Sequence, residues 1–158
     1  MTVELLLRRE SVVQYQVRLA ALLDDQKYDE FVAEFTEDGA YRLIARENHD
    51  RGLPTCIIDD TRDRLIYRSG LISRQWHHGR FRETRMLSNF DIDFPAADAA
   101  LAKANFALYH TDAEGETRLH MVGRLEDSLV MKEGRWRIRR RFGILETFKP
   151  TEVVVYPP

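Results

Sequence analysis

The sequence has a single cysteine, Cys56, in 158 residues. One thiol excludes an internal disulfide, and it excludes any zinc or iron-sulfur site built from several cysteines of this chain. Because a chain without disulfides fits a reducing compartment, we expect a cytoplasmic protein. At this length we expect one domain, residues 1–158, whose core is stable without metals or crosslinks.

Neither sign of charge dominates, since 24 basic residues stand against 26 acidic ones and the formal net charge is -2. No general field attracts polyanions, so nucleic acid is not an expected partner. Long apolar runs are absent as well, because the leucines of the N-terminal stretch end at Arg8 and Arg9. This run is too short for a signal peptide or a membrane span, and we expect a soluble chain with no membrane partner.

Several short motifs of known mechanism are also missing. The sequence has no G-x-G-x-x-G, no G-x-x-x-x-G-K-[ST], no G-x-S-x-G and no H-E-x-x-H. Dinucleotide-binding, phosphate-cradling and common hydrolase classes therefore lose support, and we expect neither a metal nor a cofactor on this chain.

The first half of the chain has helical periodicity and the second half has the period of strands. Predicted helices lie at 5–23, 28–35 and 60–72, with a short strand at 40–45 and a loop at 46–54. Predicted strands lie at 86–94, 101–111, 117–131 and 135–148. Helices followed by a meander indicate an α+β fold, in which a curved antiparallel sheet has about three N-terminal helices packed on one face.

Alternation predicts which strand residues share a face. In the first long strand, Met86 and Ser88 should face the same side as Phe90, and Arg85 and Asn89 the other. The last strand contains GRWRIRRR (134–141), the strongest charged segment. Its core face should hold Trp136, Ile138, Phe142 and Ile144, and its outer face Arg137, Arg139 and Arg141. We expect these arginines to meet carboxylates, within the fold or on a partner, rather than nucleic acid.

Two histidines, His110 and His120, flank the glycine-containing turn at 112–115. A three-residue hairpin loop would pair His110 with Arg118 and put both imidazoles on one face, whereas a two-residue loop would separate them. They could form a general acid and base in the mouth of a sheet-lined pocket, since histidine titrates near neutral pH. We favour the other interpretation, two half-exposed histidines on a structural hairpin, because histidines without partners are usually surface residues.

Several segments, taken in order, resemble known proteins. The stretch DDQKYDEFVAEFTEDGAYRL (24–43) is similar to the opening of the cone-shaped fold of ketosteroid isomerase and scytalone dehydratase. Four further segments resemble the small (β) subunit of bacterial Rieske-type ring-hydroxylating dioxygenases: RENHDRGLP (46–54), DDTRDRLIYR (59–68), RETRMLSNFDI (82–92) and the meander 105–148. A tyrosine-containing strand, a Gly-Arg and a W-R-I-x-x-R segment recur in that family.

Three positions depart from the family pattern. Met86 stands where a histidine is usual, Glu146 where an aspartate is frequent, and Leu125 where an arginine commonly follows Gly-Arg. The resemblance implies that catalysis belongs to the large subunit, so none of these changes removes a catalytic group. The loop 46–54 looks most like small subunits of systems acting on monocyclic carboxylated aromatics, such as salicylate or anthranilate.

The resemblance implies a noncatalytic structural subunit of a hetero-oligomeric oxygenase, typically with three large and three small subunits. The large (α) subunit would hold a Rieske iron-sulfur cluster and a mononuclear iron, and a reductase would supply electrons from NAD(P)H. Arginine and tyrosine are enriched at protein interfaces. The expected interface residues are Arg80, Arg82, Tyr109, Arg137 and Arg139.

An alternative stays open, namely a free-standing dehydratase or isomerase of the same fold. Its pocket would be the interior of the cone, lined by Tyr41, Phe90 and Phe106, with His110 or His120 as the general base. This alternative needs a histidine and a carboxylate within hydrogen-bonding distance inside a closed cavity.

Overall fold

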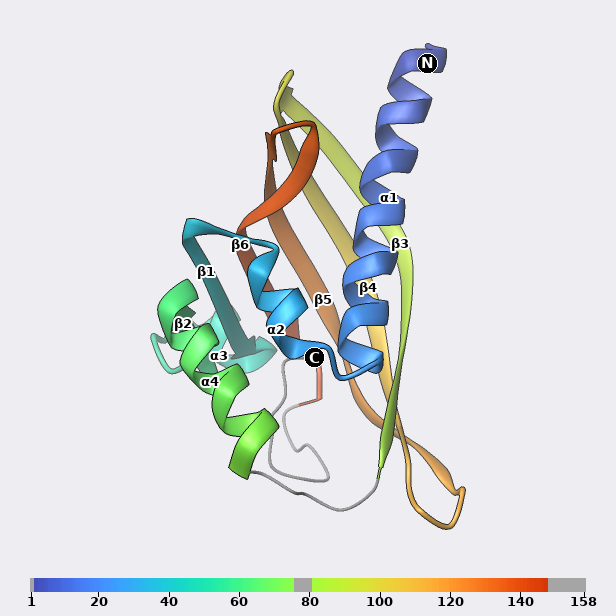
Figure 1. Cartoon of the computed structure of the whole chain (residues 1–158), viewed down its shortest axis with the longest axis vertical. Coiled ribbons are helices and arrows are strands. Elements are labelled where there is room, and N and C mark those ends of the chain that lie inside the picture. Colours follow the sequence, from blue (N-terminus) through green and yellow to red (C-terminus); the bar gives the residue numbers. More distant parts are fainter. Residues whose placement is uncertain (1, 76–80, 148–158) are drawn as a thin grey trace.

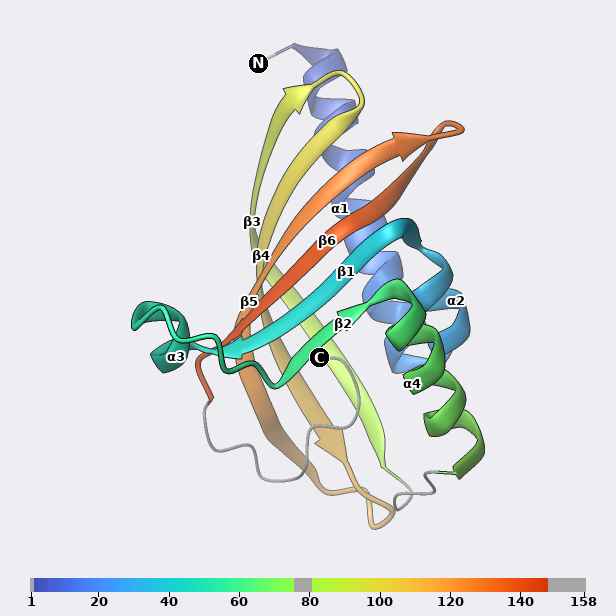
Figure 2. The same cartoon turned by 90° about the vertical axis from the view of Figure 1, so that its left-hand side faces the viewer.

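A curved six-stranded sheet carries the helices on one side, in a computed structural model that describes residues 2–75 and 81–147 (Figures 1 and 2). The strand order is β2-β1-β6-β5-β4-β3, and every neighbouring pair is antiparallel except β1 and β6. The elements are α1 (Val3–Asp24), α2 (Tyr28–Ala33), β1 (Phe35–Ala45), α3 (Arg46–Asp50), β2 (Ile58–Thr61), α4 (Arg62–Gln75), β3 (Arg82–Ala96), β4 (Ala99–Thr111), β5 (Thr117–Lys132) and β6 (Arg135–Leu145). The α+β prediction is confirmed.

The long helix α1 confirms the prediction at 5–23 and has identifiable ends. The Thr2 hydroxyl accepts a hydrogen bond from the backbone N of Leu5 at 3.2 Å, which caps the first turn. At the other end Gln26 has a φ of 58°, and the backbone N of Lys27 donates to the carbonyl of Leu22. This is a Schellman ending, and it turns the chain toward α2. The buried face of α1 consists of Val12, Tyr15, Gln16, Leu19, Leu22 and Leu23.

The second helix is shorter than predicted, because Phe35 belongs to β1 and pairs with Ile138 of β6. Strand pairing with β6 thus overrides the helical spacing, and β1 begins five residues before the predicted strand at 40–45. Asp38 and Gly39, which lie between the predicted helix and the predicted strand, are inside β1 at a register shift between Phe35 and Ala40.

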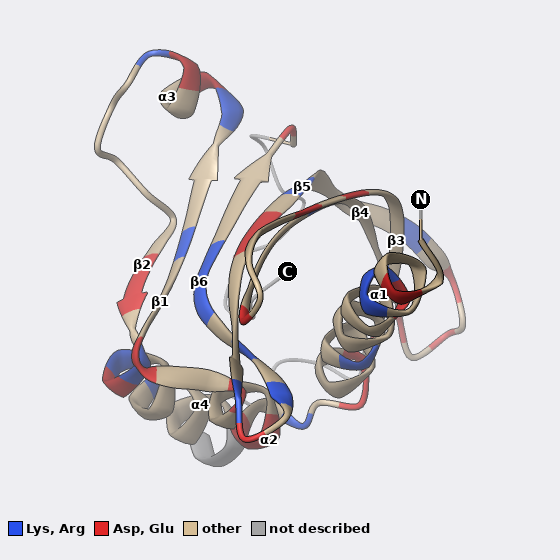
Figure 3. Ribbon diagram, turned by 90° about the horizontal axis from the view of Figure 1, so that it is seen from above, with Lys and Arg blue, Asp and Glu red and all other residues tan. Residues whose placement is uncertain are grey.

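Two further local predictions need correction. The predicted loop 46–54 begins with one helical turn, α3. The third predicted helix begins two residues late, at Arg62, because residues 58–61 form β2 against β1. In Figures 2 and 3 α1, α2 and α4 lie on one side of the sheet, and α3 lies apart from them. The hydrophobic core fills the space between those three helices and the sheet.

Helix α1 also covers the free edge of β3. The Asp24 carboxylate accepts from the backbone N of Arg85 at 3.1 Å, and Arg9 donates to the carbonyl of Phe90 at 3.0 Å. The Arg8 guanidinium donates to the carbonyls of Ala96, Ala97 and Ala99. Unpaired edge groups would otherwise be a template for pairing with another chain.

Bulges overturn two of the predicted face assignments. In β3 the register shifts between Ser88 and Asp91, and Asn89 there has a φ of 54°. Residues before the bulge therefore reverse their predicted sides, so that Arg85 is buried and Met86 is exposed. In β6 the pairing with β5 jumps from Ile138 to Arg140. Arg141 consequently turns inward and Phe142 outward, and the predicted ladder of three outward arginines is wrong.

Candidate functional site

The two histidines lie together on the inner face of the sheet. His110 pairs with Arg118, and the backbone N of Asp112 donates to the carbonyl of Glu116, as a three-residue hairpin loop requires. A bulge near His120 then makes Leu108 pair with Met121. The imidazoles stack with ring centroids 3.8 Å apart and an interplanar angle of 17°.

Both histidines are more enclosed than the favoured interpretation required. His120 is 4% exposed, and the His110 side chain is 14% exposed. The ring of Phe81 stacks on His110 at a centroid distance of 4.7 Å. The description of two half-exposed histidines is therefore wrong, because Phe81 stacks on one face of the His110 ring and the His120 ring lies against the other histidine.

A carboxylate completes this cluster. Glu83 lies 3.1 Å from Nε2 of His110 and accepts a hydrogen bond from Arg85 at 2.7 Å. Burial alone would raise the pKa of Glu83, but the hydrogen bond from His110 and the charge of Arg85 outweigh burial and lower it. Arg85 also pairs with Asp24 at the end of α1 at 2.6 Å. A continuous polar chain thus runs from Asp24 through Arg85 and Glu83 to the histidines.

A second buried ion pair lies deeper, between α1 and the sheet. Arg141 of β6 binds Asp127 of β5 at 2.6 Å, and both side chains are at most 2% exposed. Gln16 of α1 donates to Asp127 at 2.7 Å and accepts from Arg141 at 2.9 Å. These three side chains join the helix to the middle of the sheet.

The interior between α1 and the sheet contains a cavity of about 10 Å³, which is room for about one water molecule. Its walls include Phe106 and the two arginines Arg85 and Arg141. Tyr41 is fully buried, its hydroxyl has no hydrogen-bond partner among the described residues, and burial raises its pKa. Of the predicted pocket residues, Tyr41 and Phe106 are thus interior, whereas Phe90 lies on β3 and is only half-buried.

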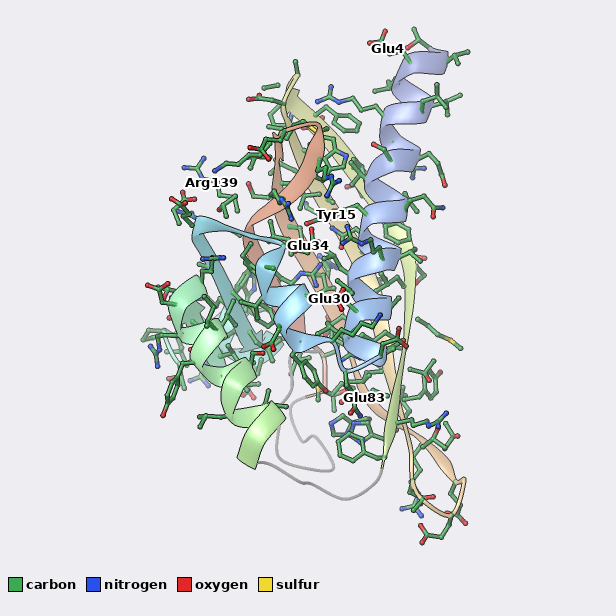
Figure 4. All side chains as sticks on the ribbon, in the orientation of Figure 1. Glu4, Tyr15, Glu30, Glu34, Glu83 and Arg139 are labelled. Atoms are coloured by element: carbon green, nitrogen blue, oxygen red, sulfur yellow. The ribbon has the colours of Figure 1, made fainter. Side chains whose placement is uncertain are left out.

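The predicted interface residues fall into two groups at opposite ends of the molecule. Arg82 and Tyr109 lie near the β4–β5 hairpin, at the end where Figure 4 labels Glu83. Arg137 and Arg139 lie at the other end, and each already has a partner within the chain. Arg137 is 3.1 Å from buried Glu34, and Arg139 is 3.4 Å from Asp38. Arg80 lies outside the described residues.

The SnoaL-like domain family matches residues 4–142 of the sequence. The chain belongs to this family. A small subunit of anthranilate 1,2-dioxygenase from Burkholderia cepacia is 24% identical over 149 residues, which cover 92% of this chain and 91% of that protein. The resemblance to dioxygenase small subunits that the sequence suggested is confirmed.

Solved structures share the fold of this SnoaL-like chain. The β subunit of a proposed aromatic-ring-hydroxylating dioxygenase from Novosphingobium aromaticivorans has a TM-score of 0.85 at 23% identity, over 96% of this chain and 97% of that one. A proposed scytalone dehydratase from the same organism has a TM-score of 0.74 at 20% identity, over 100% and 97%. The cone-shaped fold is thereby confirmed.

Within residues 2–75 and 81–147, no group of three or more histidine, cysteine, aspartate and glutamate side chains is arranged to hold a metal ion. The only cysteine, Cys56, lies on the segment between α3 and β2, far in sequence from the histidine pair. No helix in the described part of the chain is long and apolar enough to cross a membrane.

Sequence reasoning missed most of the polar interior of this SnoaL-like fold. It singled out His110 and His120 but not their partner Glu83, and it placed Arg141 on the outer face. One signal was available in the strand segment RETR. Glu83 and Arg85 lie two residues apart and therefore share one face, whereas a strictly amphipathic strand would carry apolar residues on its buried face. Asp127 gave a similar signal, since it alternates with Leu125 and Leu129 on one face of its strand. Gln16 likewise lies on the apolar stripe of the N-terminal helix.

Proposed function

We propose that this chain is a noncatalytic small subunit of a multicomponent aromatic-ring-hydroxylating oxygenase that acts on a monocyclic carboxylated aromatic compound, of salicylate or anthranilate type. The observation that carries the proposal is the end-to-end similarity to a small subunit of anthranilate 1,2-dioxygenase, over 92% of this chain and 91% of that protein. Fold alone would not support a function, since one fold can host many activities.

The packing between α1 and the middle of the sheet supports the noncatalytic part of the proposal. There, the cavity lined by Gln16, Phe106 and Arg141 holds about one water molecule, which leaves no room for a substrate at that position. The iron chemistry would then belong to a large subunit carrying a Rieske cluster and a mononuclear iron, with electrons from NAD(P)H through a reductase. A hetero-hexamer is the stoichiometry that we expect.

Gentle purification of the tagged chain from its native host tests the proposal. We expect it to bring down a much larger chain in a brown complex with the visible absorption of a Rieske cluster. A colourless chain purified alone would contradict the subunit assignment. In the assembled complex, His110→Gln should leave product formation per iron within about twofold of wild type, because the residue takes no part in chemistry.

A second candidate is favoured by one specific observation, the enclosed His110–Glu83 contact of 3.1 Å. A histidine held by a carboxylate is the arrangement of a general base, as a free-standing dehydratase or isomerase of this fold would require. That function demands the opposite result from the same variant, since His110→Gln would then abolish turnover by the isolated chain.

A further inference from the structure

The outer face of the sheet lies opposite α1, α2 and α4 (Figure 2). Helix α3 contacts it at β6, where the rings of His49 and Phe142 lie 5.7 Å apart, but over β3, β4 and β5 it has no covering layer among the described residues. At the end near the β4–β5 hairpin, side chains of three strands meet there. Ala107 pairs with Met86 and Val122, and Tyr109 pairs with Leu119. Met86 is 59% exposed and Leu119 is 50% exposed, whereas the other three are half-buried. We call these five residues the outer apolar patch.

Two rows of the same face, farther from the hairpin, have the polar composition expected of a solvated sheet. Lys103 lies between Asp91 and Glu126, and Asn105 lies between Ser88 and Arg124. An antiparallel sheet that faces water on one side carries polar residues there. The change from charged rows to an apolar patch within one face therefore indicates that the hairpin end is covered by another molecule.

The charges beside the patch restrict what can cover it. The hairpin tip carries the carboxylates of Asp112, Glu114 and Glu116 and the guanidinium of Arg118, which already pairs with Glu116 at 2.9 Å. The side chain of Glu114 makes no ion pair with any described residue. The covering surface must thus be apolar opposite the patch and basic opposite the tip.

A second copy of this chain does not offer that combination. Near the hairpin tip, the exposed basic side chains of the described residues are Arg82 and Arg118, and Arg118 is already paired. Two copies placed patch to patch would each bring an acidic tip, against which the described residues near the tip offer only Arg82 as an exposed basic side chain that is not already paired. Tyrosine and methionine are enriched in interfaces between proteins, and the charge mismatch between two acidic tips favours a different protein chain over a second copy.

We infer that the outer apolar patch is the docking surface for the large oxygenase subunit, and this inference rests on the proposed function. Met86, Tyr109 and Leu119 provide the apolar contacts, and the acidic tip meets basic side chains of the large subunit. Tyr109 and Arg82, which the sequence suggested as interface residues, lie on this surface. Arg137 and Arg139 lie at the opposite end, outside it.

The test measures binding of purified variants to the large subunit recovered with the wild-type chain from the native host. Met86→Lys/Leu119→Lys should weaken binding by about tenfold or more, because it puts two charges into an apolar contact. Leu101→Lys is the matched control, since Leu101 is 44% exposed on the same face but pairs with Asp93 and Ser128 in the charged region. This control should bind like wild type. Glu114→Lys should slow association and reduce its salt dependence.

The outcomes separate the surface from the function. If wild type recovers no large subunit, the proposed function fails. If wild type binds and the Met86→Lys/Leu119→Lys variant binds equally well, only the docking surface is wrong. Thermal unfolding of each isolated variant shows whether a loss of binding is a loss of fold, and Tyr109→Ser provides a second, uncharged variant for that case. Self-association of isolated wild type that Leu119→Lys abolishes would assign the patch to a second copy and overturn the inference.

Discussion

Glu83 is the residue at which the polar interior meets the histidine pair. Its carboxylate is 5% exposed, and it accepts hydrogen bonds from Arg85 at 2.7 Å and from His110 at 3.1 Å. A buried carboxylate stays charged only if such donors offset the loss of hydration. In Glu83 they more than offset it, since the pKa lies below its ordinary value of 4.5.

The lowered pKa of Glu83 predicts a specific loss of stability in acid. A carboxyl with a depressed pKa in the folded state adds stability above its unfolded pKa, and this contribution disappears as the pH falls through the folded value. From neutral pH to below 4.5, the free energy of unfolding should therefore drop more steeply for wild type than for Glu83→Gln. Urea unfolding at a series of pH values measures this difference. Glu114→Gln at the exposed tip is the control, and its free energy of unfolding should fall with pH as in wild type. Parallel curves for wild type and Glu83→Gln would show that the contacts of Glu83 contribute nothing to stability.

Arg141 is the basis of a second prediction at the residue scale, because its replacement leaves a buried charge unpaired. Arg141→Met leaves the Asp127 carboxylate without its cation, and only Gln16 remains to bind it. We expect a loss of about 3–5 kcal/mol in the free energy of unfolding by urea. Arg42→Met is the control, since Arg42 and its partner Asp59 are both at least half exposed and should cost less than about 1 kcal/mol. In Arg141→Met/Asp127→Asn part of the loss should be recovered, and strictly additive effects would argue against a coupled pair.

At the scale of the elements, bulges decide which side chains the sheet buries. Alternation identified the four long strands and their turns correctly, because the periodicity of β3 to β6 is strong. It failed at Asn89 and between Ile138 and Arg140, where one extra residue in the strand reverses the faces of the side chains beside it. Sequence reveals period but not the position of a bulge, so the burial of Arg141 was not predictable, and for Arg85 the alternation in RETR was the available sign. The short strand β2 and the early start of β1 depend on pairing with distant strands, which local spacing does not reveal.

The close packing of β5 against Phe106 of β4, which pairs with Gly123, gives a prediction at the scale of the elements. A Cβ atom at Gly123 would lie 2.5 Å from the carbonyl O of Ile144 and 2.8 Å from the Phe106 ring. Gly123→Ala should therefore force the backbones of β5 and β6 apart and destabilise the fold by about 1–3 kcal/mol in urea unfolding. Gly143→Ala is the matched control, because the close contact of its Cβ, at 2.6 Å, would be with the end of the flexible Leu43 side chain and not with backbone. Equal losses in the two variants would mean that the backbone contact is not limiting.

On the scale of the whole molecule, the sheet has two different faces and two different edges. One face is closed by α1, α2 and α4, and the other carries charged rows and the outer apolar patch. The short strand β2 forms one edge, and the 15-residue strand β3 forms the other. A long edge of this kind invites pairing with another chain, and here α1 lies along it. Helix α1 thus closes the core and also shields the edge, so that the outer face remains the surface available to a partner.

The shielding of β3 by α1 can be tested with a variant that spares the core. Arg8→Ala/Arg9→Ala removes the donors to the carbonyls of Phe90, Ala96, Ala97 and Ala99 and leaves the buried face of α1 unchanged. We expect the isolated chain to self-associate with increasing concentration in sedimentation velocity, because the edge of β3 is opened. Arg51→Ala/Arg124→Ala loses the same charge from exposed ion pairs and should sediment like wild type. If both variants associate equally, the loss of positive charge is the cause. If the Arg8→Ala/Arg9→Ala variant stays monomeric like wild type, α1 does not shield the edge, and β3 protects it by its own bulge at Asn89 and the proline at position 95.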